Sequence, residues 1–144
     1  LQTGQTMTER LADSLMPEKP YDVCLYGLNY DSRTELYEKI ERRVDIMMEK
    51  GILEEARFVY KNRECWHTAA QAIGYKEFFP FFEGTMPLEL CVDELKKATR
   101  HYAKRQLTWF QADDRIHWIV YNTVEAADQV TEKATIFLQQ AGLK

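Results

Sequence analysis

The sequence is best understood outward from Ala98–Trp109, which reads ATRHYAKRQLTW. Extended upstream at the three- and four-residue spacing of an α-helix, its apolar positions form a single stripe. We therefore predict one long helix from Pro87 or Leu88 to about Ala112, with Pro87 in the first turn, where its missing N–H is tolerated. The stripe expected on this helix consists of Cys91, Leu95, Ala98, Tyr102 and Trp109.

The same predicted helix carries a basic face. No acidic residue occurs from Lys96 to Gln111, although the whole chain has a formal charge of −4. Lysine and arginine at helical spacing suit the phosphates of RNA or another polyanion. The alternative is a solvated helix face, whose cations in the later turns complement the helix dipole. The cations are Lys97, Arg100 and Lys104, flanked by Lys96, His101 and Arg105.

Capping signals predict a second long helix upstream. Ser32-x-x-Glu35 is a capping box that opens a helix through Lys50, and Gly51 closes it. Its buried stripe is expected to comprise Leu36, Ile40, Val44 and Met47.

The remaining segments are predicted from weaker patterns. Arg63–Thr68 is expected to be a loop whose Trp66 and His67 either pack on the protein or meet a base. The glycine at position 74, inside a predicted helix, suggests close approach of another backbone. A last helix is capped by Asn122-Thr123, with Val130, Ala134, Phe137 and Leu138 facing inward. The predicted helices are Leu53–Asn62, Ala69–Phe82 and Val124–Gln140, and Thr8–Met16 is either a short helix or an ordered loop.

Two stretches read as strands, Tyr21–Leu28 and Ile116–Tyr121. Both are apolar on both faces, which is typical of strands covered on two sides in an α/β sheet. We expect a mainly α protein whose two strands belong to a sheet with further strands elsewhere. An unpaired strand edge invites pairing between copies, so the chain on its own is expected to self-associate.

Composition excludes several classes of protein. With 144 residues, 45% apolar and 29% charged, the chain is one ordinary globular domain in size. Its three cysteines form no Cys-x-x-Cys pair and read as reduced thiols. The three histidines lack metal-ligand spacing, and no catalytic Ser/His/Asp or Cys/His set is recognisable. No apolar run approaches the ~20 residues that span a bilayer.

Three ordered motifs resemble the tRNA dimethylallyltransferases, which prenylate the adenosine next to the anticodon. They are Leu36-Tyr37-x-x-Ile40-x-x-Arg43-Val44-Asp45-x-Met47 with Gly51-x-Leu53-x-Glu55, then Gln71–Glu77 (QAIGYKE), then Thr99–Trp109 (TRHYAKRQLTW). The resemblance runs from about Gln2 to about Tyr121. Their order and spacing make the match specific, which no single motif would be.

The resemblance implies the C-terminal half of a P-loop kinase-like fold with a helical tRNA-binding insertion. It implies a linker and core strand over 1–30, a helical tRNA-binding region over 31–112, and a strand and helix returning to the catalytic core over 113–144. The family's phosphate loop and general-base Asp have no counterpart in this sequence. The chain is therefore expected to be a fragment that is inactive alone.

The resemblance also implies the chemistry of the parent enzyme. The N6 amine of adenosine displaces diphosphate from dimethylallyl diphosphate, with Mg²⁺ bound mainly by the part outside this sequence. The partner is the tRNA anticodon stem-loop, and the parent is expected to be a cytoplasmic, monomeric enzyme without a membrane segment.

Site residues carry over by position. Arg33 matches a family Arg linked to the donor diphosphate, with capping of the following helix as its alternative role. Lys39 and Gln111 stand where the family commonly has Arg. The expected tRNA contacts are Gln71, Ala72, Ile73, Gly74, Tyr75, Lys76, Arg100, Lys104, Arg105, Gln106, Leu107, Thr108, Trp109, Phe110 and Gln111.

Physical chemistry divides their roles. Lysine and arginine would position phosphates, and the glutamines with Tyr75 and Trp109 would hydrogen-bond to or stack on splayed bases. For Trp109 and Tyr102, which share the apolar stripe, packing in the core is favoured over contact with a base. Two other functions remain open: a non-enzymatic helical RNA-binding module, and a structural helical domain whose basic helix pairs with an acidic protein.

Overall fold

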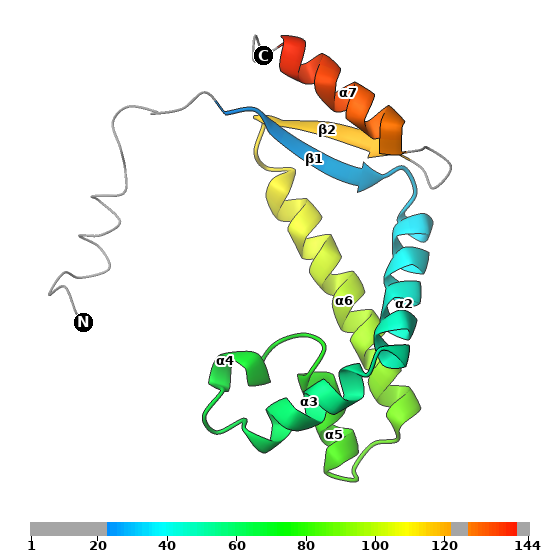
Figure 1. Cartoon of the computed structure of the whole chain (residues 1–144), viewed down its shortest axis with the longest axis vertical. Helices are drawn as coiled ribbons and strands as arrows, with labels where there is room; N and C mark the ends of the chain where they lie inside the picture. The colour runs from blue at the N-terminus through cyan, green and yellow to red at the C-terminus, as the bar shows by residue number, and fades with distance from the viewer. Residues whose placement is uncertain (1–22, 122–126, 141–144) are drawn as a thin grey trace, which may run out of the picture.

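The computed structural model describes residues 23–121 and 127–140. Two long helices, α2 (Arg33–Glu49) and α6 (Leu88–Phe110), run from a small sheet to a cluster of short helices (Figure 1). That cluster contains α3 (Ile52–Lys61), α4 (His67–Ala70), a 3-10 turn (Lys76–Phe78) and α5 (Phe79–Phe82). The sheet contains β1 (Leu25–Tyr30) and β2 (Ile116–Tyr121), and α7 (Ala127–Gln140) lies on the side of it opposite α2 and α6.

The helix boundaries follow the capping residues. The Thr34 N–H donates to Ser32 Oγ at 3.1 Å, which satisfies one of the free donors at the start of α2. Gly51, at φ +91°, ends that helix in the left-handed conformation that glycine tolerates. The predictions for α2, α3 and α6 are confirmed to within two residues at each end.

One core holds the helices together. Val44 from α2 and Leu95 and Cys91 from α6 are fully buried with Phe78 of the 3-10 turn and Ala56 of α3. Residues predicted to face inward from both long helices thus meet residues of the short ones. Burial raises the pKa of the Cys91 thiol, as expected for a cysteine packed as an apolar side chain.

The helix predicted over Ala69–Phe82 is wrong. The segment breaks into α4, a turn, the 3-10 turn and α5. Gly74 adopts φ +108°, outside the helical region, and its N–H donates to Glu77 Oε2 at 2.9 Å. The glycine therefore interrupts the helix instead of marking a close helix crossing.

The two predicted strands pair with each other in parallel, with Leu25 opposite Ile116 and Tyr30 opposite Tyr121. The second strand has the predicted bounds, whereas the first begins at Leu25 and runs two residues beyond its predicted end at Leu28. The two strands thus belong to one sheet, as predicted, and the described residues contain no further strand of it. A larger P-loop-type sheet and the three predicted sections of the chain stay predictions.

The last helix covers one face of the sheet. Phe137 of α7 stacks on His117 of β2 with ring centroids 5.3 Å apart, and lies 6.1 Å from the ring of Tyr26. Val130 and Ala134 are half-buried as predicted, but Leu138 is exposed, because it turns away from the strands that Phe137 faces. The predicted Asn122-Thr123 cap and Thr8–Met16 lie outside the described residues.

We predict that Leu95→Ala lowers the free energy of unfolding by about 2–5 kcal/mol, since Leu95 is 1% exposed in the core. Leu90→Ala, on the same helix but 51% exposed, is the matched control and should change it by about 0.5 kcal/mol or less. Urea unfolding measures both. If both variants lose the same free energy of unfolding, the face of α6 that packs in the core is not the one that carries Leu95.

We also predict that the isolated chain self-associates through the sheet. In the described part of the chain each strand has one neighbour, and Leu28 of β1 is 56% exposed. Light scattering after size exclusion should give a mass above 17.0 kDa that rises with concentration. Leu28→Lys should shift the protein toward monomer, and Phe58→Lys on α3 should not. A monodisperse monomer at every concentration would contradict this expectation.

Candidate nucleic-acid groove

A groove of about 780 Å³ lies between α2, α6 and the turn over 71–76. We call it the helical groove. Its floor is apolar and includes Val44 and Leu95 of the core. Its other lining residues are mostly polar or aromatic: Arg43, Gln71, Lys76, Thr99, Tyr102, Arg105 and Gln106.

The electrostatics of the helical groove are positive. Arg43, Lys76 and Arg105 come from three different segments, and all three are exposed. No carboxylate is among the described residues that line the groove, and no ion pair within the described part of the chain involves these three cations. Three unneutralised cations around one concave surface favour a polyanionic ligand.

Other cations of α6 are neutralised by neighbouring acids. Lys96 Nζ lies 2.6 Å from Asp45 Oδ1, and Arg100 pairs with Glu41, so two ion pairs join α6 to α2. Lys97 pairs with Glu94 on its own helix at 3.1 Å. The continuous basic face expected from the sequence is therefore divided. Its early cations pair with carboxylates, and Lys104 and Arg105 remain without an ion pair among the described residues.

The turn over 71–76 is held in shape by its own contacts. The bond from the Gly74 N–H to Glu77 closes it, and the Tyr75 hydroxyl reaches Glu55 Oε2 of α3 at 3.5 Å. Tyr75 therefore points toward α3. Gln71 and Lys76, on either side of the turn, line the helical groove.

Most of the expected tRNA contacts line one of three cavities, whereas Arg100, which pairs with Glu41, lines none of them. The helical groove is lined by Gln71, Ile73, Gly74, Lys76, Arg105 and Gln106, while Ala72 and Tyr75 belong to the same turn without lining it. A smaller polar cavity of about 200 Å³ is lined by Lys104, Leu107, Thr108 and Gln111. Trp109 and Phe110 line a third, aromatic cavity, which Leu107 and Gln106 also border.

The polar cavity brings Arg33 close to the basic helix. Arg33 opens α2 and Lys104 lies on α6, and both line this cavity beside Ser32. The cavity is also lined by the carboxylate of Asp31, and the Thr34 N–H at the start of α2 already donates to Ser32 Oγ. The structure therefore places Arg33 and Lys104, from different helices, in one cavity of mixed charge.

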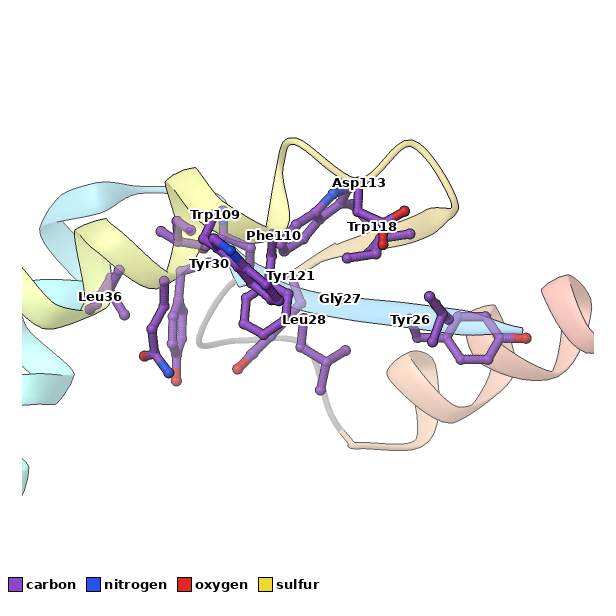
Figure 2. A pocket seen from close by; sticks show the side chains of 16 residues that line it. Tyr26, Gly27, Leu28, Tyr30, Leu36, Trp109, Phe110, Asp113, Trp118 and Tyr121 are labelled. Atoms are coloured by element: carbon purple, nitrogen blue, oxygen red, sulfur yellow. The ribbon is translucent and has the colours of Figure 1, made fainter. Parts of the chain in front are cut away.

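The aromatic cavity, of about 590 Å³, opens between the sheet and the end of α6 (Figure 2). Trp109 and Phe110 meet edge to face at 4.8 Å and lie over β1 near Tyr30 and Tyr121. Trp109 is 73% exposed, so the prediction of core packing is wrong for this residue in the chain as described. Trp66 is also 42% exposed and packs edge to face on Phe58 rather than in the core.

The junction between α6 and β2 is fixed by one residue pair. Asp113 accepts bonds from Arg115 Nε at 2.8 Å and from the Arg115 backbone N–H at 3.1 Å. These bonds lower the pKa of Asp113 to about 2, so the carboxylate is charged across the physiological range.

The two strands are linked at their ends by a tyrosine pair. A hydrogen bond with Tyr30 raises the pKa of Tyr121 to about 12.

Three polar or aromatic residues that line the helical groove are absent from the tRNA contacts expected from the sequence: Arg43, Thr99 and Tyr102. The first stands inside the Leu36–Met47 motif, and the other two inside the Thr99–Trp109 motif. The motif positions could have identified them, but which face of each helix meets the groove depends on how α2 and α6 pack.

Two further classes of site are not found in the described residues. They contain no group of three or more His, Cys, Asp or Glu side chains that could hold a metal ion. None of their helices is both long and apolar enough to cross a lipid bilayer.

Comparison with known proteins gives a consistent result. Residues 1–113 match the family model described as IPP transferase. The chain is 54% identical over 101 residues to the tRNA dimethylallyltransferase of Lactobacillus helveticus, which covers 70% of this chain and 33% of that protein. It is 46% identical over 121 residues to the enzyme of the same name from Streptococcus agalactiae, which covers 84% of this chain and 40% of that protein.

Solved structures agree. The full-length tRNA isopentenylpyrophosphate transferase of Bacillus halodurans superposes with a TM-score of 0.76 at 34% identity, over 93% of this chain and 44% of that one. The tRNA isopentenylpyrophosphate transferase of Staphylococcus epidermidis gives 0.75 at 32% identity, over 96% and 44%. This chain thus spans less than half the length of each of these relatives.

Proposed function

The chain belongs to the IPP transferase family. We propose that it binds the anticodon stem-loop of tRNA as part of a tRNA dimethylallyltransferase; we call this the gripping role. The family is shown by the match over residues 1–113 and by the named relatives. The gripping role rests on the helical groove described above.

The observation that carries this proposal is the meeting of two motifs far apart in sequence. The turn over 71–76 and the segment 99–106 line one groove, together with Arg43 from the third motif. Its three cations from three segments would hold backbone phosphates, while Gln71 and Gln106 would read base edges.

The reaction we propose for the complete enzyme is transfer of a dimethylallyl group. The N6 nitrogen of the adenosine forms a bond to C1 of the donor, the C1–O bond to diphosphate breaks, and the N6 proton leaves to a base. In this chain Arg33 and Lys104, which share the polar cavity, would contact the departing diphosphate. Cations placed there stabilise charge that develops as the bond breaks.

We expect this chain to be inactive alone. Its 144 residues contain no Gly-x-x-x-x-Gly-Lys-Ser/Thr loop for a phosphate donor. The described residues contain no group of three or more His, Cys, Asp or Glu side chains that could hold Mg²⁺, and we propose that the ion acts in the complete enzyme. We also propose that this activity is cytoplasmic, as expected for an enzyme that modifies tRNA.

A second function is favoured by the self-contained helical core. The core of Val44, Ile52, Phe78, Cys91 and Leu95 is built without the sheet. The segments that line the helical groove thus pack on one another in the described residues, which also suits a non-enzymatic RNA-binding module.

We predict salt-dependent binding of a labelled anticodon stem-loop, measured by fluorescence anisotropy across a salt titration. Lys76→Ala/Arg105→Ala removes two proposed phosphate contacts. Affinity should fall, and the slope of log K against log salt should become shallower by about 1.4, because each contact to a single strand contributes about 0.7. Lys104→Ala/Arg105→Ala should weaken binding through Arg105 in any case, and its change in slope should reach about 1.4 only if Lys104 in the polar cavity also holds an RNA phosphate.

Arg42→Ala/Lys61→Ala is the matched control. It removes the same charge from exposed positions that line none of the three cavities. If the control weakens binding as much, net charge rather than the groove holds the RNA. If the folded chain binds no RNA at low salt, gripping by this chain alone is ruled out. The exposed cations of α6 would then be better explained by binding to an acidic protein.

A further inference from the structure

Tyr102 occupies a position that its sequence pattern does not explain. It falls on the apolar stripe of α6 between Leu95 and Trp109, yet 46% of it is exposed. Its side chain lines the helical groove instead of joining the core. A large aromatic ring exposed within a groove is available to a ligand.

The surroundings of the ring are cationic. The Arg105 guanidinium lies 5.8 Å from the ring centroid, near the ~6 Å limit of direct cation–π attraction. The attraction between Arg105 and the ring is therefore weak, and little free energy is lost if a flat ligand group replaces the guanidinium over the ring. Arg43 and Lys76 line the same groove from the other segments.

Two side-chain amides near Tyr102 can form hydrogen bonds with a base. Gln106 lies one helical turn beyond Tyr102 on α6, and Gln71 lines the groove from the turn over 71–76. Among the described residues, no partner is recorded for either side-chain amide, so both remain able to pair with a base edge. An aromatic ring, amides and phosphate-binding cations are the groups that recognise unpaired nucleotides.

We propose that Tyr102 is the platform on which an unpaired base of the RNA stacks, so that the helical groove takes loop nucleotides and not the paired stem. This deepens the proposed function and rests on it. Bases in a duplex are stacked on each other and cannot lie against a side-chain ring, whereas a loop base can. The volume of about 780 Å³ is within the range of sites that enclose a small-molecule-sized group, which suits a nucleotide rather than a helix of RNA.

The test uses the full chain and an anticodon stem-loop in which one loop adenosine is replaced by 2-aminopurine, whose fluorescence is quenched by stacking. Binding of the unaltered protein should quench the probe. Tyr102→Leu should abolish the quenching and weaken loop binding roughly tenfold, as expected for loss of one base–aromatic contact. Tyr102→Phe keeps the ring and should retain both.

Phe58→Leu on α3 is the matched control. Phe58 is an exposed aromatic residue outside the helical groove, so its removal should change neither signal. A blunt-ended RNA duplex serves as a second probe, and Tyr102→Leu should leave its binding unchanged. Circular dichroism verifies that each variant is folded.

The possible failures are distinguishable. If Tyr102→Leu binds and quenches like the unaltered protein while salt-dependent binding persists, the stacking role is wrong and the gripping role stands. If Tyr102→Leu weakens duplex and loop equally, the groove does not select unpaired nucleotides. If the unaltered chain binds neither probe, the stacking role falls together with the proposed function.

Discussion

The packing of α2 on α6 is the constraint on which the rest of the structure depends. Val44 and Leu95 meet in the core, and Phe78 and Ala56 fix the short helices against them. Beyond this contact the two long helices continue to the sheet (Figure 1). The helical groove lies along them, and its floor is the core itself. A residue that disturbs the core would therefore alter the groove, even without touching a ligand.

The ion pairs between the long helices affect the charge of the groove, because they neutralise carboxylates of α2. Lys96 with Asp45 and Arg100 with Glu41 join α6 to α2. Partly exposed pairs of this kind add only about 0–1 kcal/mol each to stability. Their larger consequence is electrostatic, since they neutralise the acids of α2 nearest to α6. The cations that line the groove are then left to attract a polyanion.

Sequence reasoning predicted the parts of the fold that local chemistry controls. Ser32 and Gly51 set the ends of α2, and the paired apolar stretches gave two strands. It failed where tertiary geometry decides. Gly74 adopts φ +108° and breaks a segment whose spacing looked helical. For the site, the motifs located both segments of the groove, but not the ion pair of Arg100 or the exposure of Tyr102 and Trp109. Those outcomes depend on which faces of two helices meet, and the spacing within one helix does not contain that information.

We propose that the 71–76 turn and the 99–106 segment, far apart in sequence, hold the RNA together, and a crosslinking experiment would show whether both lie against it. An anticodon stem-loop with 4-thiouridine in its loop would be irradiated in complex with the full chain, and the crosslinked peptides identified by mass spectrometry. Crosslinks are expected in both the 71–76 turn and the 99–106 segment of α6. Crosslinks confined to the outer surface of α3 and α4, with neither groove segment labelled, would contradict this proposal.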